Sequence, residues 1–234
     1  MLEHLLDPAN WTGSSGIAVR MLEHLAYTAI AIIIAAAIAL PAGIAIGVTG
    51  RGEAIVAGLA NALRALPTLG LLILIVLLVA PLIPNRLAFS IPALIVLVLL
   101  AVPPMLTGAY SGIQSADRDA VQAATGMGYT RSQTLWRVQL PMALPRILSG
   151  VRGSLLQVVS TATVAAFVSL GGLGRLIIDG RATQDYPQML AGAVAVAALA
   201  LLLELLFLLI ERLAVSPGIT RRTPSRSVAA LAAG

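Results

Sequence analysis

The stretch DRDAVQAATGMGYTRSQTLWRVQLPMALP, residues 117–145, decides how the chain is organised. It contains five charged residues, whereas residues 87–116 before it and 153–174 after it contain none. An uncharged apolar run of about 20 residues is long enough to span a bilayer as a helix. The quoted stretch is therefore predicted to be a polar connection outside the membrane, between two membrane-spanning helices.

The stretch itself predicts two short helices joined by a turn. Ser115, Asp117 and Asp119 are suited to cap and charge the start of a helix, which then passes through residues 121–124. Gly126 and Gly128 are suited to end that helix in a tight turn. Thr130 and Gln133 have the spacing of a capping box, which predicts a second helix. This second helix carries Leu135, Trp136, Val138 and Leu140 and is expected to end at Pro141.

The rest of the chain has the composition of a helical membrane protein. Apolar residues make up 59% of the chain and charged residues 11%, against about 45–50% and about 25% in a soluble domain. This excludes an ordinary soluble enzyme, a disordered chain and, with no cysteine, a disulfide-stapled module. The expected fold class is all-α and polytopic, with about five transmembrane helices at residues 25–50, 54–84, 87–116, 153–174 and 186–210. Kinks are expected at Pro41, Pro67, Pro92, Pro103 and Pro104.

Arginine positions predict the orientation. All 15 basic residues are arginines that flank apolar runs, which indicates membrane topology rather than nucleic-acid binding. Ten lie on the side of residues 117–145 and four on the other side, so the loop and C-terminus are expected in the cytoplasm. The expected organisation is an extracytoplasmic segment at 1–24, a membrane domain at 25–213 and a disordered cytoplasmic tail at 214–234.

From its residues alone, the polar loop has two alternative roles. Ala123 and Ala124 allow close approach of another backbone, and Tyr129 and Trp136 are suited to anchor in a cleft of a partner protein. The alternative is an amphipathic helix on anionic lipid, with Trp136 among the headgroups and arginines snorkelling. The residue types favour neither alternative over the other.

A known family shares the spacing of this loop. Gln122-Ala123-Ala124, three residues, Gly128, nine residues and Val138-x-Leu140-Pro141 resemble the E-A-A-x3-G-x9-I-x-L-P loop of binding-protein-dependent ABC importer permeases. Gln122 replaces the usual Glu, which removes a charge, and Val138 replaces Ile. The resemblance extends over about residues 24–213 and implies an ABC importer permease (MetI-like) fold. The stretches that look like the subgroup importing quaternary amines are His24-Leu25 through Pro41-Ala42-Gly43, Leu66-Pro67-Thr68 and Gly171-Gly172-Leu173-Gly174.

The resemblance implies a multi-pass permease in the bacterial cytoplasmic membrane that works with several partners. The loop would dock on a separate ATPase, which holds ATP and Mg, so a substitution such as Gly128→Asp would disturb the turn and the docking. A second permease copy or paralogue would complete the pathway. A separate binding protein would deliver glycine betaine, choline or carnitine and carry the aromatic cage for the quaternary ammonium group.

The chain itself is expected to be non-catalytic and to hold no cofactor or metal. It has no phosphate-binding G-x-x-x-x-G-K-[ST] motif and no lysine, and His4 and His24 are too few and too far apart for a metal site. Inside the apolar runs, Arg64, Pro67 and Glu204 are candidates for a pathway or gate. The alternatives are a gradient-driven secondary transporter or channel, which would need its own coupling site, and a membrane enzyme of lipid metabolism, against which the missing acidic metal motif argues.

Overall fold

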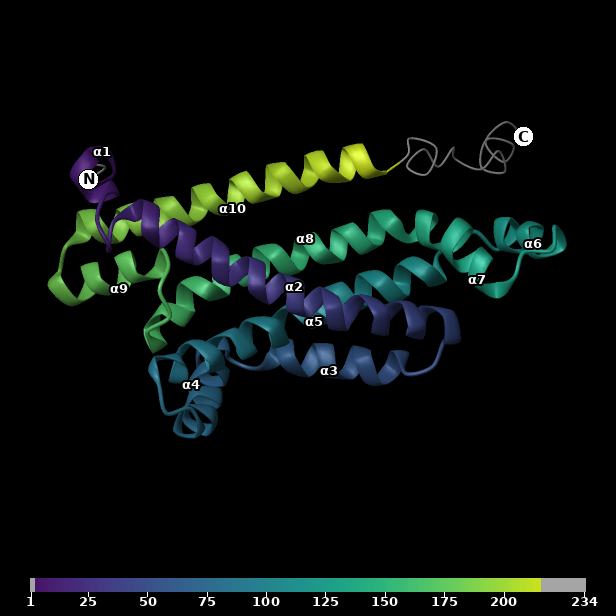
Figure 1. Ribbon diagram of the computed structural model, residues 1–234, viewed down its shortest axis with the longest axis horizontal. Coiled ribbons are helices and arrows are strands. Elements are labelled where there is room, and N and C mark those ends of the chain that lie inside the picture. Colours follow the sequence, from purple (N-terminus) through teal and green to yellow (C-terminus); the bar gives the residue numbers. More distant parts are fainter. Residues whose placement is uncertain (1–2, 216–234) are drawn as a thin grey trace, which may run out of the picture.

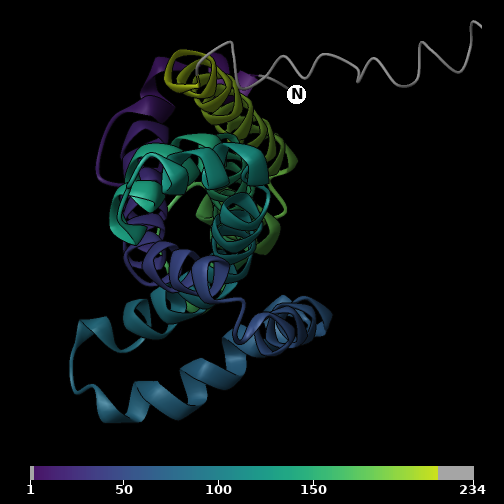
Figure 2. The same ribbon diagram turned by 90° about the vertical axis from the view of Figure 1, so that its right-hand side faces the viewer.

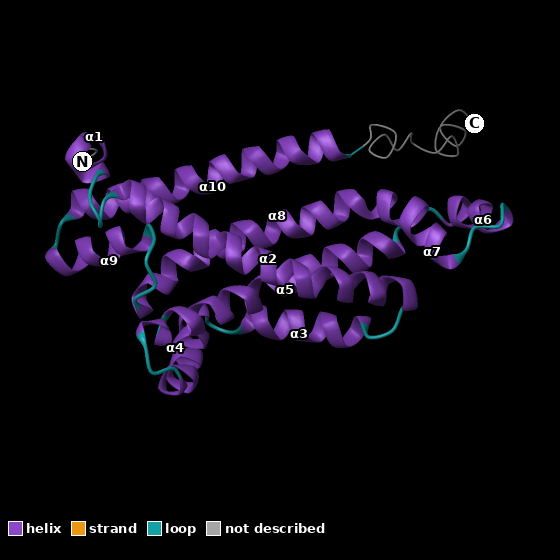
Figure 3. Ribbon diagram, viewed as in Figure 1, coloured by secondary structure: helices purple, strands orange, loops and turns teal. Residues whose placement is uncertain are grey.

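The computed structural model describes residues 3–215, except for the side chains of Glu3, Arg64 and Arg86, and this part of the chain is helical (Figure 3). The longer helices are α2 (Ile17–Thr49), α3 (Glu53–Ala65), α4 (Thr68–Val79), α5 (Ser90–Gln114), α6 (Arg118–Gly126), α8 (Leu140–Ala165), α9 (Gly174–Thr183) and α10 (Tyr186–Ala214). The shorter elements are α1 (Glu3–Leu6), α7 (Arg131–Thr134), the π-helical turn η4 (Leu135–Gln139) and the 3-10 turns η1 (Pro8–Trp11), η2 (Ala80–Leu82), η3 (Arg86–Ala88) and η5 (Ala166–Val168).

Four or five candidate membrane spans are present, in agreement with the roughly five that the apolar runs predict. Within residues 3–215, four helical segments are long and apolar enough to cross a membrane: Ile17–Thr49, Ser90–Gln114, Arg131–Val168 and Tyr186–Ala214. A fifth crossing is formed only if the helices on either side of Pro67, which are bent by 96°, count as one broken span. The predicted tail at 214–234 lies, apart from its first two residues, outside the described part of the chain.

The bend in the second apolar run has a local cause. Leu66, the residue after α3, is extended, with φ −75° and ψ 134°, because the ring of the following proline disfavours a helical conformation there. Pro67, with a φ of −60°, is the N-cap residue immediately before α4. Residues 54–84 therefore form two helices that meet at a sharp bend, and α4 lies across the long axis of the bundle (Figure 2).

The core is built around α5, which packs against both α2 and α8 along the bundle axis (Figure 1). Ala31, Ala35 and Ala39 form a fully buried strip of α2 with a spacing of four residues. Farther along α2, a Cβ at Gly43 would lie 2.6 Å from the Cβ of Ala109 on α5. Small residues let the helix backbones approach closely, which supplies packing energy that the hydrophobic effect does not provide inside a bilayer.

Two helices do not coincide with the predicted uncharged runs. The first helix begins at Ile17, eight residues before the uncharged run, and includes Arg20 and Glu23, which form an ion pair at 3.0 Å. The fourth spanning segment runs from Arg131 to Val168 instead of covering 153–174. It stops early because Ser169 and Gly172 take left-handed conformations, with φ 66° and 87°, which turn the chain towards α9.

Candidate functional site

The polar loop is a two-helix element at the end of the bundle opposite α1 and α9 (Figure 1). As predicted, Asp117 caps its first helix, α6, by accepting a hydrogen bond from the backbone N–H of Asp119 at 2.9 Å. The predicted capping box is also present. The Gln133 N–H donates to the Thr130 hydroxyl at 3.3 Å, and the Thr130 N–H donates to the Gln133 side chain at 2.8 Å.

Gly128 forms the turn between the two helices. Its φ is +86°, in the left-handed region that favours glycine. Its N–H donates to the Thr125 carbonyl at 3.0 Å, and the N–H of Tyr129 donates to the Ala124 carbonyl at 3.1 Å. These bonds satisfy carbonyls at the end of α6 and set the angle at which the chain enters α7.

The second loop helix does not end at Pro141, contrary to the prediction. It continues through η4 into α8, and Pro141 is the second residue of α8. In an α-helix the proline ring would clash with the carbonyl four residues earlier. Here the helix widens into a π turn, in which the Leu140 N–H donates to the Leu135 carbonyl, five residues back. The loop and the fourth span are therefore one continuous helical segment.

The second loop helix is also attached to the bundle by packing. Leu135 and Leu140 contact a buried cluster of α5 and α8 that includes Ala109, Ile113 and Ile147. Val138 is half-buried on the same segment. A force on the loop is therefore carried into the membrane domain by direct contacts as well as by the continuous helix.

The exposed face of the loop differs from the predicted one at Ala124, Met127 and Tyr129. Trp136 is 66% exposed and free to enter a partner's cleft. Tyr129 is half-buried, and the guanidinium of Arg137 lies 6.0 Å from its ring centroid, so this ring is part of the loop's own structure. Met127, which the sequence analysis did not single out, is 71% exposed. Met127 lies between Gly126 and Gly128, and its place in a glycine-rich turn could have indicated from the sequence that it is exposed.

The Gln122-Ala123-Ala124 segment divides between surface and interior. Gln122 and Ala123 are exposed, and Ala124 is buried. Gln122 thus lies on the surface that a partner would meet, where a neutral amide replaces the family's carboxylate.

Two of the three pathway candidates, Arg64 and Pro67, lie together at the bend between α3 and α4, whereas Glu204 lies on α10. Arg64 is in the last turn of α3, and its side chain is outside the described residues. Pro67 lies at the 96° bend. Glu204 lies on α10, and its carboxylate is 3.3 Å from the guanidinium of Arg152 on α8, which also contacts Glu211 at 3.5 Å. Glu204 thus belongs to an ion-pair cluster between two helices, and Arg152 is the residue that sequence reasoning missed.

We expect Arg152→Ala to destabilise the contact between α8 and α10. Without the guanidinium, Glu204 and Glu211 would be unpaired, at a cost of about 1–2 kcal/mol for groups that remain partly exposed. A thermal unfolding scan in detergent should show a lower Tm. The double variant Arg152→Ala/Glu204→Ala should recover part of that loss, and an unchanged Tm for the single variant would contradict a structural role.

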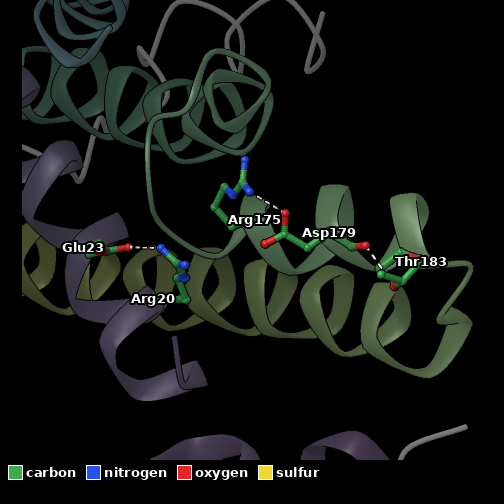
Figure 4. Close-up of polar contacts among 6 residues, drawn as sticks. Arg20, Glu23, Arg175, Asp179 and Thr183 are labelled. Carbon is green, nitrogen blue, oxygen red and sulfur yellow. Dashed lines mark hydrogen bonds and ion pairs between the residues drawn. The ribbon is translucent and has the colours of Figure 1, made fainter. Parts of the chain in front are cut away.

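At the opposite end, Arg20 pairs with Glu23 on α2, and Arg175 pairs with Asp179 on α9 (Figure 4). The Glu23 carboxylate accepts hydrogen bonds from the guanidinium of Arg20 at 3.0 Å and from the Gly172 N–H at 2.8 Å. His24 is fully buried, with Nε2 3.0 Å from the Val159 carbonyl. The turn before α9 thus approaches α2 closely, since a Cβ at Gly172 would lie 3.1 Å from His24 Nδ1.

Among the described residues, no three histidine, cysteine, aspartate or glutamate side chains lie close enough together to hold a metal ion. The described residues form a helical membrane domain with a two-helix polar loop at one end. The chain belongs to the family of binding-protein-dependent transport system inner membrane components, whose model matches residues 37–216. It is accordingly a multi-pass, non-catalytic permease subunit of an ABC importer.

Curated relatives and solved structures agree with this assignment. The chain is 31% identical over 224 residues to the carnitine transport permease protein OpuCD of Listeria monocytogenes, covering 95% of this chain and 96% of the relative. It is 29% identical over 210 residues to the choline transport system permease protein OpuBB of Bacillus subtilis, covering 90% and 94%. The fold is similar to a chain of the MetNI methionine ABC transporter in an inward-facing form. There the TM-score is 0.72 at 22% identity, covering 88% of this chain and 96% of that one.

Proposed function

We propose that this permease imports small quaternary amines such as choline, carnitine or glycine betaine, and that residues 117–145 couple it to a separate ATPase. The names of the relatives carry the proposed substrate class. The observation that carries the coupling role is the loop, in which Met127 and Trp136 are exposed on an element fastened rigidly to the bundle. Large apolar side chains presented on a fixed frame are typical anchors of a protein interface.

The proposed mechanism uses the continuity of the segment Arg131–Val168. The partner ATPase binds ATP and Mg and closes on ATP, which favours the permease conformation that fits the closed ATPase. Because the loop continues into α8 without a break, movement of the loop moves α8 as a rigid body. This chain supplies the lever and part of the pathway, and the ATPase supplies the chemistry.

The distribution of arginines supports the proposed orientation, and the family supports the remaining partners. The loop and the C-terminus face the cytoplasm, and α1, α9 and the N-terminus face the other side, where a binding protein delivers the substrate. A second permease, either a copy or a paralogue, completes the pathway. Only nine of 234 residues are aromatic, which supports an aromatic cage on the binding protein rather than on this chain.

The test is reconstitution with Trp136→Ala as the diagnostic variant. We expect uptake of labelled choline or glycine betaine to require the ATPase and ATP. Trp136→Ala should weaken ATPase binding roughly 30-fold, the effect of losing a hot spot worth ~2 kcal/mol. The matched control is Tyr186→Ala, an aromatic residue that is 67% exposed at the opposite end of the bundle. Uptake that proceeds without an ATPase would instead support a gradient-driven transporter.

A further inference from the structure

One face of α8 is exposed and polar, although α8 crosses the membrane. The residues recur every three or four positions, which places them on one side of the helix. They are Arg146, Ser149, Gly153, Gln157 and Ser160, and we name them the α8 polar stripe. Gln157 is half-exposed and the other four are exposed, and the same side of the helix continues through Val164 to Phe167. A Cβ at Gly153 would have no atom within 4 Å, so this side of the helix is open.

The exposed faces of the other long helices are apolar. On α2 this face includes Leu22, Ile30, Ile33, Ile34 and Ile38, and on α10 it includes Val194, Leu201, Leu202, Leu205 and Leu209. Such faces suit lipid. The α8 polar stripe therefore differs from its surroundings in chemistry, and not only in exposure.

The stripe passes through the middle of the membrane domain. Ser154 of α8 donates a hydrogen bond of 2.7 Å to the carbonyl of Ala101, which lies near the centre of α5. Gly153 and Gln157 flank this point. Ser160 lies about 9 Å beyond it, at 1.5 Å of rise per residue. Water must therefore reach deep into the membrane domain if it is to solvate the stripe.

Lipid is a poor neighbour for this stripe. Among residues 3–215, no hydrogen-bond partner is found for the side-chain amide of Gln157, which carries two donors and an acceptor. An unsatisfied polar group in hydrocarbon costs several kcal/mol. Ser160 reduces its own cost by donating to the Gln157 carbonyl at 3.0 Å. The side chain of Gln157 has no comparable hydrogen bond within residues 3–215, so we infer that water solvates it.

A surface hollow with several polar groups in its lining continues the stripe towards the coupling loop. It has a volume of about 260 Å³ and lies between α5 and α8, with Thr107, Ser111, Arg146 and Ser149 among its lining residues. The Arg146 guanidinium donates to the Ser111 carbonyl at 3.1 Å. Polar surface therefore extends from the stripe onto α5 at the end of the bundle nearest the loop.

We propose that the α8 polar stripe lines the water-filled route by which the substrate crosses the membrane. This inference rests on the proposed import function and assigns the route to particular residues. Between Ser149 and Ser160 the stripe carries hydroxyl and amide groups but no charge, so it can hydrate a quaternary amine without trapping it. The stripe also lies on the helix that continues into the coupling loop, so movement of the loop repositions it.

Cysteine labelling in the complete importer tests the route directly, because the chain has no cysteine of its own. Gln157→Cys and Ser160→Cys place single thiols on the stripe. Ala197→Cys on α10 and Ala37→Cys on α2 place matched thiols on exposed apolar faces. The probe is a water-soluble trimethylammonium-ethyl methanethiosulfonate, which reacts with the thiolate. The stripe positions should react at least about tenfold faster than the controls, because thiolates form only where water reaches them.

The same samples distinguish failure of this inference from failure of the proposed function. Labelled Ser160→Cys should lose uptake while the importer still hydrolyses ATP. If both stripe thiols react no faster than the controls while uptake still requires the ATPase, the route assignment is wrong and the importer function stands. Slow labelling together with ready oxidative cross-linking to the second permease also overturns the route, because it makes the stripe a dry contact. Uptake without the ATPase overturns the proposed function itself.

Discussion

Replacing Gly128 by valine should uncouple transport from ATP hydrolysis while leaving the membrane domain folded. The backbone of Gly128 has a φ of +86°, which a β-branched residue adopts only as an outlier. Left-handed backbone costs an ordinary residue about 1–2 kcal/mol, and a penalty of that size lowers the equilibrium constant for forming the native turn roughly 5–30-fold. Uptake in reconstituted vesicles should fall, by at most about the same factor.

The choice of control separates backbone strain from the added side chain. A Cβ at Gly128 would have no atom within 4 Å, so a side chain there meets no clash. Gly128→Asn should therefore retain most of the uptake, because asparagine tolerates the left-handed region. Gly128→Asp, which the sequence alone predicted to disturb the turn, shares this tolerance of the left-handed region, so the charge that it adds next to Met127 should weaken docking more than it disturbs the turn. Normal ATPase binding and uptake by Gly128→Val would refute the assigned role of the turn.

Gly150→Val should destabilise the membrane domain more than any other substitution discussed above. A Cβ at Gly150 would lie 2.7 Å from the Pro104 carbonyl oxygen and 3.1 Å from the Cα of Gly108 on α5. Both neighbours are backbone atoms and cannot move aside as a flexible side chain does. Overpacking of this kind costs about 1–3 kcal/mol or more. The purified protein in detergent should show a clearly lower Tm and a shorter lifetime.

Gly153→Ala is the matched control, one turn farther along α8. A Cβ there would have open space within 4 Å, and alanine favours a helix over glycine by about 0.5–1 kcal/mol. Its Tm should be unchanged or slightly higher. Equal losses of stability at the two positions would contradict the close crossing of α5 and α8.

Local chemistry explains the features that sequence analysis predicted correctly. The Asp117 cap, the Thr130 and Gln133 capping box and the Gly128 turn each depend on side chains within a few residues of one another. The membrane spans depend on runs of apolar residues, which are also local. Pro67 terminates a helix through its effect on the preceding residue, although the sequence alone did not show that two separate helices result.

The wrong predictions involve compensation from neighbouring structure. Pro141 was expected to end a helix, but a π turn at Leu135–Gln139 lets the helix pass through. The uncharged run begins after Arg20 and Glu23, but the helix α2 includes both; they pair with each other, and Glu23 accepts a hydrogen bond from the N–H of Gly172. These outcomes depend on the positions of carbonyl and carboxylate oxygens in space, which cannot be read from the order of residues.

The sequence alone determined that the chain lies in a membrane, how many apolar segments it has and that its polar loop forms two helices. Each of these features depends on residues within about one helix length of one another. Tertiary structure alone decided which segments meet. Glu23 receives a hydrogen bond from Gly172, 149 residues away, and Arg152 pairs with Glu204 across two helices. Folding likewise decided that the polar side of α8 remains exposed while its other sides are covered. Burial is a property of neighbours in space, and α8 acquires those neighbours only when α2, α5 and α10 have packed around it.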